Sequence, residues 1–137
     1  MEVRIRHIKG NQFEANTRGH RVLCDQPTEN HGDNAGMTPP ELFLASIGAC
    51  AMHYGAEYLR TRGLPLPGLD IRITGTKGGQ PVRVAEIDLS VNVPALDSRH
   101  RQGLIRAIEA CLLHRTLLNP PRIGVKLASE ETVASHG

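Results

Sequence analysis

Residues 39–62 constrain the fold of this chain more than any other stretch. They read PPELFLASIGACAMHYGAEYLRTR, with no proline after the opening pair, and Gly63 and Pro65 follow them. Thr38 is suited to cap the N-terminus of a helix, and proline is well tolerated in a first helical turn. The stretch therefore predicts a helix about 36 Å long at 1.5 Å per residue. A helix of that length spans a small domain, so we expect it to run through the middle and to be covered on more than one side.

Alternating apolar and polar residues predict strands on both sides of this helix. Val3, Ile5 and His7 alternate with Arg4 and Arg6, which is the pattern of a strand with one solvated face. The other segments predicted as strands are, in chain order, residues 13–17, 21–24, 69–74, 86–93 and 122–127.

A second helix is predicted between the last two strands. Asp97 or Ser98 can cap it, and the prolines at 120 and 121 end it. Its apolar residues at helical spacing are Leu104, Ile108, Cys111 and Leu112. The element order is then β-β-β-α-β-β-α-β, an α+β fold with antiparallel sheet on each side of the long helix. With 137 residues and no internal repeat, we expect a single domain over residues 1–137.

The composition argues against several classes of function. Two Phe, two Tyr and no Trp do not suit a stacking platform for single-stranded nucleic acid. The formal net charge is only +2 and the basic residues are dispersed, so no nucleic-acid partner is expected. No apolar run approaches the ~20 residues that span a bilayer, and the N-terminus MEVRIRHIKG lacks the apolar core of a signal peptide. We therefore expect a cytoplasmic protein without a membrane partner, in which thiols stay reduced unless they do redox work.

Two of the three cysteines occur in the same local pattern, a Cys followed three residues later by a His. ACAMHY contains Cys50 and His53, and CLLH contains Cys111 and His114. Residues i and i+3 share a helix face, so the two pairs could supply a Cys₂His₂ zinc site. Structural zinc ligands, however, usually come from tight turns, and a free Cys is often a buried packing residue. A packing residue, a zinc ligand and a redox thiol remain the three interpretations of Cys50.

The redox interpretation needs a thiolate, because the thiol is a poor nucleophile. Cys50 lies near the middle of the predicted helix, too far from its N-terminus for the helix dipole to stabilise that thiolate. A neighbouring cation must do so instead. His53 shares the helix face, and Arg18 or Arg21 could supply a permanent charge. Cys111 also falls inside its predicted helix, which suits a second thiol held in place.

Three segments resemble one known family. GMTPPELFLASIGAC, residues 36–50, resembles the signature of the OsmC/Ohr family, the osmotically induced and organic-hydroperoxide-resistance proteins. That signature is G-x-x-P-x-E-L, two or three apolar residues, [AS], two residues, then [GA]-x-C. TRGHRVLCDQP, residues 17–27, is similar to the R-G-x and apolar-x-x-D-x-P segment, and CLLHRTLLNPP, residues 111–121, to the second-cysteine motif. The resemblance covers nearly the whole chain in the right order and points to the broader OsmC-like branch.

The resemblance implies an intertwined homodimer in which sheets wrap two long central helices and the active sites lie at the dimer interface. It implies a thiol peroxidase of organic hydroperoxides, acting without a cofactor in oxidative-stress defence. By position Cys50 matches the peroxidatic cysteine, Cys111 the resolving cysteine that forms a disulfide with it, and Arg18 the residue that stabilises the thiolate. A dithiol, dihydrolipoyl or thioredoxin-like, would reduce that disulfide.

Three positions depart from the family pattern. The peroxidases carry a glutamate ten positions before the first cysteine, where this chain has Pro40, with Glu41 one residue on. In the OsmC-like branch a glutamate at position 41 supports the site or caps the helix. Leu112 stands where a proline often follows the second cysteine, and Cys24 has no family role. The alternative function is therefore a non-catalytic homodimer that binds an apolar small molecule in its interface pocket.

Overall fold

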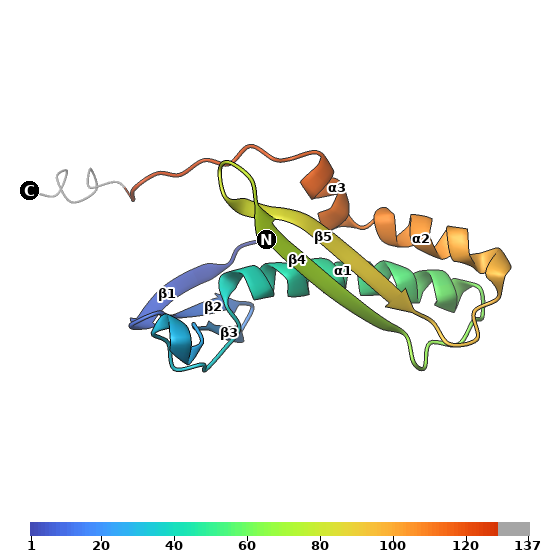
Figure 1. Cartoon of the computed structure of the whole chain (residues 1–137), viewed down its shortest axis with the longest axis horizontal. Coiled ribbons are helices and arrows are strands. Elements are labelled where there is room, and N and C mark those ends of the chain that lie inside the picture. The colour runs from blue at the N-terminus through green and yellow to red at the C-terminus, as the bar shows by residue number, and fades with distance from the viewer. Residues whose placement is uncertain (129–137) are drawn as a thin grey trace, which may run out of the picture.

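The computed structural model describes residues 1–128, in which one long helix joins two antiparallel sheets (Figure 1). The first sheet consists of β1 (Arg4–Lys9), β2 (Gln12–Thr17) and β3 (His20–Cys24), and the second of β4 (Asp70–Gly78) and β5 (Arg83–Asn92). The helices are α1 (Pro39–Thr61), α2 (Arg101–Glu109) and α3 (Leu112–Leu118), with the short 3₁₀ turns η1 (Thr28–Asn30) and η2 (Ser98–His100). The α+β class, the antiparallel sheets and the predicted order as far as β5 are confirmed.

The first sheet has a polar face and an apolar face. On the polar face Glu14 is only 6% exposed, and its carboxylate accepts hydrogen bonds from the Asn16 amide and the Arg21 guanidinium. These donors, Asn16 foremost, hold the pKa of the Glu14 carboxyl below its usual value. The apolar face carries Ile5, Phe13, Ala15, Val22 and Cys24. A groove of about 380 Å³ separates part of this face from the first turns of α1.

The loop between β3 and α1 is ordered by Asp25, a buried carboxylate that accepts four hydrogen bonds. The donors are the backbone N–H groups of Gln26 (2.7 Å), Asp33 (3.1 Å) and Ala35 (3.0 Å) and the side-chain amide of Gln12 (3.2 Å). The bond from Ala35 contributes most to holding the pKa of Asp25 below its ordinary value. The loop thereby brings Met37 beside Cys24 in a parallel bridge. The start of α1 is tied in this way to the first sheet.

The bounds of α1 agree with the sequence prediction. The Glu41 backbone N–H donates to Thr38 Oγ1 at 3.3 Å, and the Thr38 backbone N–H donates to Glu41 Oε1 at 2.9 Å, which is a reciprocal capping box. These bonds hold the pKa of the Glu41 carboxyl below its usual value. The helix ends at Thr61, and Gly63 then adopts a φ of +63° that favours glycine. The long central helix is therefore confirmed.

One side of α1 packs against β4, α2 and α3 (Figure 1). The core of this region joins Ala51 of α1 to Leu104 and Ile108 of α2, with half-buried residues of β4 and β5 around them. Gly55 faces α2, and a Cβ there would lie 3.4 Å from the Ile108 side chain, at the edge of ordinary van der Waals contact. This side of the helix therefore faces the core of the second sheet and α2.

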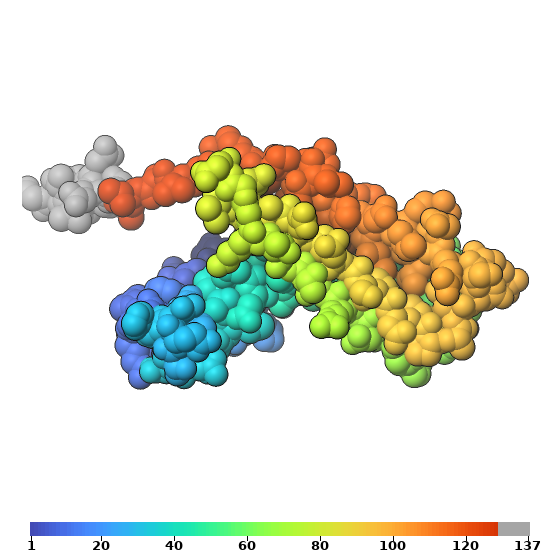
Figure 2. All heavy atoms as spheres, in the orientation of Figure 1, coloured from blue at the N-terminus to red at the C-terminus, as the bar shows by residue number. Residues whose placement is uncertain are grey.

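The opposite side of α1 is open in the single chain. Ala45, Ala49 and His53 are exposed there. Figure 2 shows the first sheet set apart from β5, α2 and α3, and the main contacts between elements of residues 1–128 do not join the two sheets. We expected α1 to be covered on more than one side, but within residues 1–128 this chain covers it on one side only.

The predicted second helix is two helices, and this prediction was wrong at Cys111. α2 ends at Glu109, and Cys111 has φ −63° and ψ 149°, an extended conformation, before α3 starts at Leu112. The Cys111 side chain accepts the His114 backbone N–H and so caps α3. Apolar residues at helical spacing continue across the break, which is why periodicity alone predicted one helix.

The predicted closing strand at residues 122–127 is also absent from the single chain, although the element order required it. Within the described residues no neighbouring strand runs beside this segment, and a strand needs a partner for its backbone N–H and C=O groups. Ile123, Val125 and Leu127 are 83%, 96% and 95% exposed.

Among residues 1–128 no helix is long and apolar enough to cross a membrane.

Candidate functional site

Cys50 and Cys111, far apart in the sequence, meet between α1 and the α2–α3 junction. Cys50 lies in the interior of α1 and is half-buried, whereas Cys111 is 1% exposed. Both are free thiols, and they lie close enough together for Cys50 to raise the pKa of Cys111. The packing of α2 and α3 on α1 therefore places two thiols side by side, as a redox pair requires.

The surroundings of the two thiols are not equivalent. Burial is the largest effect on Cys111 and raises the pKa of its thiol, and the neighbouring Cys50 raises it further. The His114 backbone N–H, which donates to Cys111 Sγ at 3.3 Å, acts in the opposite direction with a smaller effect. The pair therefore keeps a proton on Cys111, and Cys50 is the more accessible of the two sulfurs.

An apolar groove of about 340 Å³ lies between α1, β5 and α3, and neither sulfur is part of its lining. Its walls include Phe43, Ile47, Ile87, Leu89, Leu117 and Leu118. Ile47 lies one helical turn before Cys50, so the groove begins next to that cysteine. His114 also lines it, and every other described residue of its lining is apolar. A small apolar molecule in this groove would lie close to Cys50.

The two arginines expected near Cys50 lie elsewhere in the single chain. Arg18 is exposed in the turn between β2 and β3, with a φ of +50°, beside a groove at the N-terminus. No hydrogen bond or ion pair within residues 1–128 joins it to either thiol. Arg21 is bonded to Glu14 on the polar face of the first sheet. The structure therefore brings the two cysteines together but not the arginines.

Two further candidates have local partners of their own. Glu41 belongs to the capping box of α1. His53 is exposed and its ring meets that of Tyr54 edge to face, with centroids 5.6 Å apart. Within residues 1–128 no three His, Cys, Asp or Glu side chains are grouped as a metal site.

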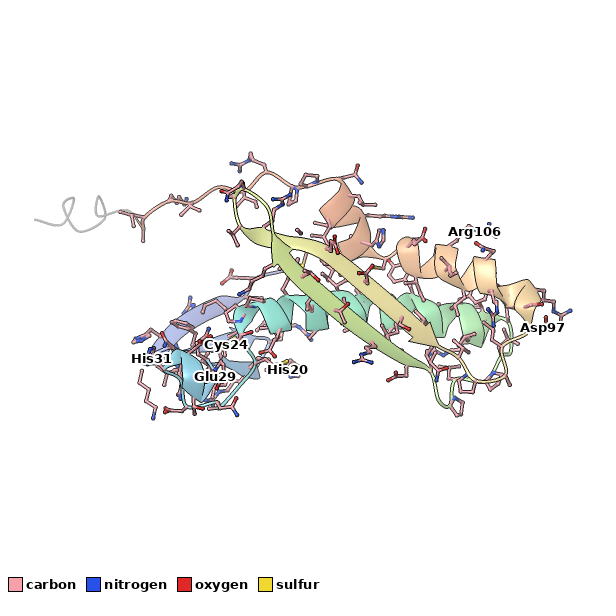
Figure 3. All side chains as sticks on the ribbon, viewed as in Figure 1. His20, Cys24, Glu29, His31, Asp97 and Arg106 are labelled. Atoms are coloured by element: carbon pink, nitrogen blue, oxygen red, sulfur yellow. The ribbon has the colours of Figure 1, made fainter. Side chains whose placement is uncertain are left out.

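Cys24 lies in the first sheet, away from the thiol pair. Figure 3 shows it with His20, Glu29 and His31 around the first sheet, whereas Asp97 and Arg106 lie at the other end of the structure. Cys24 is buried at the end of β3, where it pairs with Phe13. This position is that of a packing residue.

Sequence reasoning missed the position of His114 in the groove. The Cys-x-x-His spacing did single this residue out, but as a possible metal ligand or packing residue. The position of His114 depends on the interruption between α2 and α3 at Cys111, because one continuous helix would point the His114 side chain in another direction. The role of Asp25 in ordering the loop was likewise not foreseen, since its donors come from residues up to thirteen positions away.

The fold and the site define a class of protein, an α+β chain in which one thiol from a long helix meets another from a C-terminal helix pair. A family model described as OsmC-like protein matches residues 32–126, which include both thiols. This chain therefore belongs to the OsmC-like protein family.

Several solved structures share its fold. An OsmC-like protein of Mycoplasma pneumoniae matches with a TM-score of 0.72 at 16% identity, over 87% of each chain. The organic hydroperoxide resistance protein OhrB of Bacillus subtilis matches with a TM-score of 0.60 at 18% identity, over 88% of this chain and 93% of its own. A Legionella pneumophila structure described as an organic hydroperoxide resistance protein OsmC gives 0.60 at 16%, over 85% and 89%. No protein with a curated description matches this sequence.

Proposed function

We propose that this protein is a thiol peroxidase that reduces organic hydroperoxides to alcohols, with Cys50 as the peroxidatic and Cys111 as the resolving cysteine. The observation that carries the proposal is the contact between these two thiols. Membership of the OsmC-like family, and fold relatives named for hydroperoxide resistance, support a stress-related redox role. The proposed site of action is a reducing compartment such as the cytoplasm, where the pair would rest as free thiols.

The unequal burial of the thiols supports this assignment of roles. A peroxidatic cysteine must reach its substrate as a thiolate, and Cys50 is the half-buried member beside the groove. A resolving cysteine need only meet the oxidised sulfur afterwards. Cys111 is buried, keeps its proton and already touches Cys50.

The proposed reaction has two steps and reduces the O–O bond by two electrons. The Cys50 thiolate attacks the terminal oxygen of the hydroperoxide, so that an S–O bond forms, the O–O bond breaks and an alkoxide leaves as the alcohol after gaining a proton. The Cys111 thiol then displaces the hydroxyl of the Cys50 sulfenic acid, which releases water and forms a disulfide. A dithiol donor, dihydrolipoyl or thioredoxin-like, returns both cysteines to thiols.

The apolar lining of the groove supports an organic rather than an inorganic peroxide as substrate. Its volume of about 340 Å³ lies at the lower end of the range of small-molecule sites. An alkyl or aryl group packed against Phe43 and Ile47 would place the peroxide near Cys50. Hydrogen peroxide has no such group to bury.

We further propose that the active form is a homodimer. Residues 122–127 have the alternation of a strand, and within residues 1–128 no strand pairs with them. The apolar face of the first sheet and the small residues Ala45 and Ala49 of α1 are also open. A second copy that covers these surfaces would bury them, and it is the proposed source of an Arg18 side chain near Cys50.

Two observations favour a second candidate function, a homodimer that binds an apolar molecule without turning it over. Glu41 is committed to the helix cap, and Pro40 offers no carboxylate to hold an arginine. In that case the groove would bind its ligand and Cys50 would stay reduced in the presence of peroxide.

The peroxidase proposal is tested by the consumption of cumene hydroperoxide by reduced protein with a dithiol donor. We expect turnover by the wild type, none by Cys50→Ser, and turnover by Cys24→Ser, the control that removes the remote thiol. One equivalent of peroxide should lower the intact mass by two hydrogens, whereas Cys111→Ser should instead gain one oxygen. Wild-type consumption no faster than that of Cys50→Ser would favour the binding function.

A further inference from the structure

We infer that His114 is a catalytic acid, whose imidazolium gives a proton to the alkoxide that leaves when Cys50 attacks a hydroperoxide. The inference rests on the proposed peroxidase function and goes beyond it by naming the proton donor. It starts from His114, which among residues 1–128 is the one ionisable residue that lines the groove.

His114 connects the groove to the thiol pair. It lines the groove together with Phe43 and Ile47 of α1, and Ile47 lies one helical turn before Cys50. Its backbone N–H donates to Cys111 Sγ at 3.3 Å, which fixes the first turn of α3 against the thiols. A hydroperoxide whose terminal oxygen faces Cys50 and whose carbon chain lies in the groove therefore has its inner oxygen near His114.

The other groups that could move a proton there are few. Every other described residue in the lining is apolar, and the carboxylates of β5, Glu86 and Asp88, alternate with Ile87 and so stand on the opposite face of that strand. Arg115, the next residue of α3, is exposed. The titratable side chain bonded to His114 is Cys111, whose sulfur accepts the His114 backbone N–H.

The chemistry needs such a donor. An alkoxide is a poor leaving group, because its conjugate alcohol is a very weak acid, and a positioned acid typically accelerates such a step about 10²–10⁴-fold. Histidine carries a transferable proton near neutral pH. An arginine cannot fill this role, because it is not deprotonated in proteins.

The step balances without another reagent. The Cys50 thiolate gives an electron pair to the terminal oxygen, which keeps its hydrogen and becomes the hydroxyl of the sulfenic acid. The O–O pair passes to the inner oxygen, which takes the Nε2 or Nδ1 proton of the imidazolium and leaves as the alcohol. The neutral imidazole regains its proton from solvent, since the groove is open at the surface.

The test varies the leaving group. Reduced protein is mixed with tert-butyl hydroperoxide or with peracetic acid, and the oxidation of Cys50 in a single turnover is followed by quenching with an alkylating agent and intact mass. Peracetic acid expels acetate, which leaves without needing a proton. We expect His114→Gln to slow the reaction with tert-butyl hydroperoxide about 100-fold or more and to leave that with peracetic acid nearly unchanged.

The fold of the variant is checked separately by its circular dichroism and its unfolding midpoint, because peracetic acid also oxidises the thiols of an unfolded chain. The matched control is His7→Gln, in the first sheet, where His7 bonds the Gly10 carbonyl at 2.9 Å. It should react at the wild-type rate with both oxidants.

Two outcomes overturn the inference and leave the peroxidase function standing. Equal slowing of His114→Gln with both oxidants would make His114 a structural residue, and no slowing with either would remove it from the reaction. A wild-type protein whose Cys50 stays reduced with both oxidants would overturn the peroxidase function itself, and the inference with it.

Discussion

The two halves of this molecule differ in how much of their apolar surface they bury. The half formed by β4, β5, α2 and α3 packs on α1, buries Leu104 and Ile108 and closes around a pair of thiols. The half formed by β1, β2 and β3 satisfies its polar groups but leaves Ile5 and Val22 exposed on its apolar face. The difference teaches that one chain is sufficient to hold the two sulfurs together, but not to bring Arg18 to them. In the proposed active site, the packed half supplies both sulfurs of one chain, and the first sheet of a second copy supplies Arg18.

The largest effect on the rate of Cys50 oxidation should come from removing the Arg18 guanidinium. Arg18→Ala should slow the oxidation of Cys50 by peroxide about 10- to 1000-fold, because a nearby opposite charge favours an ionised group by roughly one to three pKa units. If the arginine reaches the thiol of the other copy, a mixed dimer of Arg18→Ala and Cys50→Ser regains one intact site. The measurement is the peroxide consumption of differently tagged, co-purified dimers. No recovery over either parent would place Arg18 and Cys50 of one chain in the same site.

The next effect concerns stability in the two halves. Leu59, which has no exposed surface, belongs to the packed half, and Leu59→Ala should lower the free energy of unfolding by about 2–5 kcal/mol. Val22→Ala on the first sheet should cost under ~0.5 kcal/mol if that face remains a surface. Chemical unfolding at two protein concentrations measures both. A cost of Val22→Ala that grows with protein concentration would show that a second copy covers the sheet.

The smallest effect concerns the link between the halves, the loop held by Asp25. Because its hydrogen bonds lower the pKa of Asp25 from 3.8, the folded state favours the ionised form. That stabilisation is present above about pH 4 and is lost as pH falls through the lowered pKa. Asp25→Asn should therefore unfold at lower urea than the wild type near neutral pH, and the gap should shrink below about pH 4. Asp88→Asn, on the exposed face of β5, is the control and should show a constant, small difference.

Local rules explain what could be predicted from the sequence. The bounds of α1 follow from Thr38, Glu41 and Gly63, each of which acts within a few residues of itself. The strands up to β5 follow from alternation. The contact of Cys50 with Cys111 was expected only from a family resemblance, because residue spacing does not fix which helix faces meet.

The wrong predictions share a cause in non-local structure. Apolar spacing continues through Cys111, but the helix is interrupted there because Cys111 is extended and its side chain caps α3. Residues 122–127 have a strand pattern, but pairing requires a neighbour that the described part of this chain does not provide. The positions of Arg18 and His114 could not be predicted for the same reason.

The cap at Cys111 shows that a serine could take the structural role of this residue. Serine is among the best helix N-caps, and its oxygen is a better acceptor for the His114 N–H than a thiol sulfur. A serine would therefore suit α3 at least as well, in a site with little room for anything larger. The sulfur atom adds nothing that the helix needs, so replacing it by oxygen is a single-atom change that separates the architecture of this protein from its chemistry.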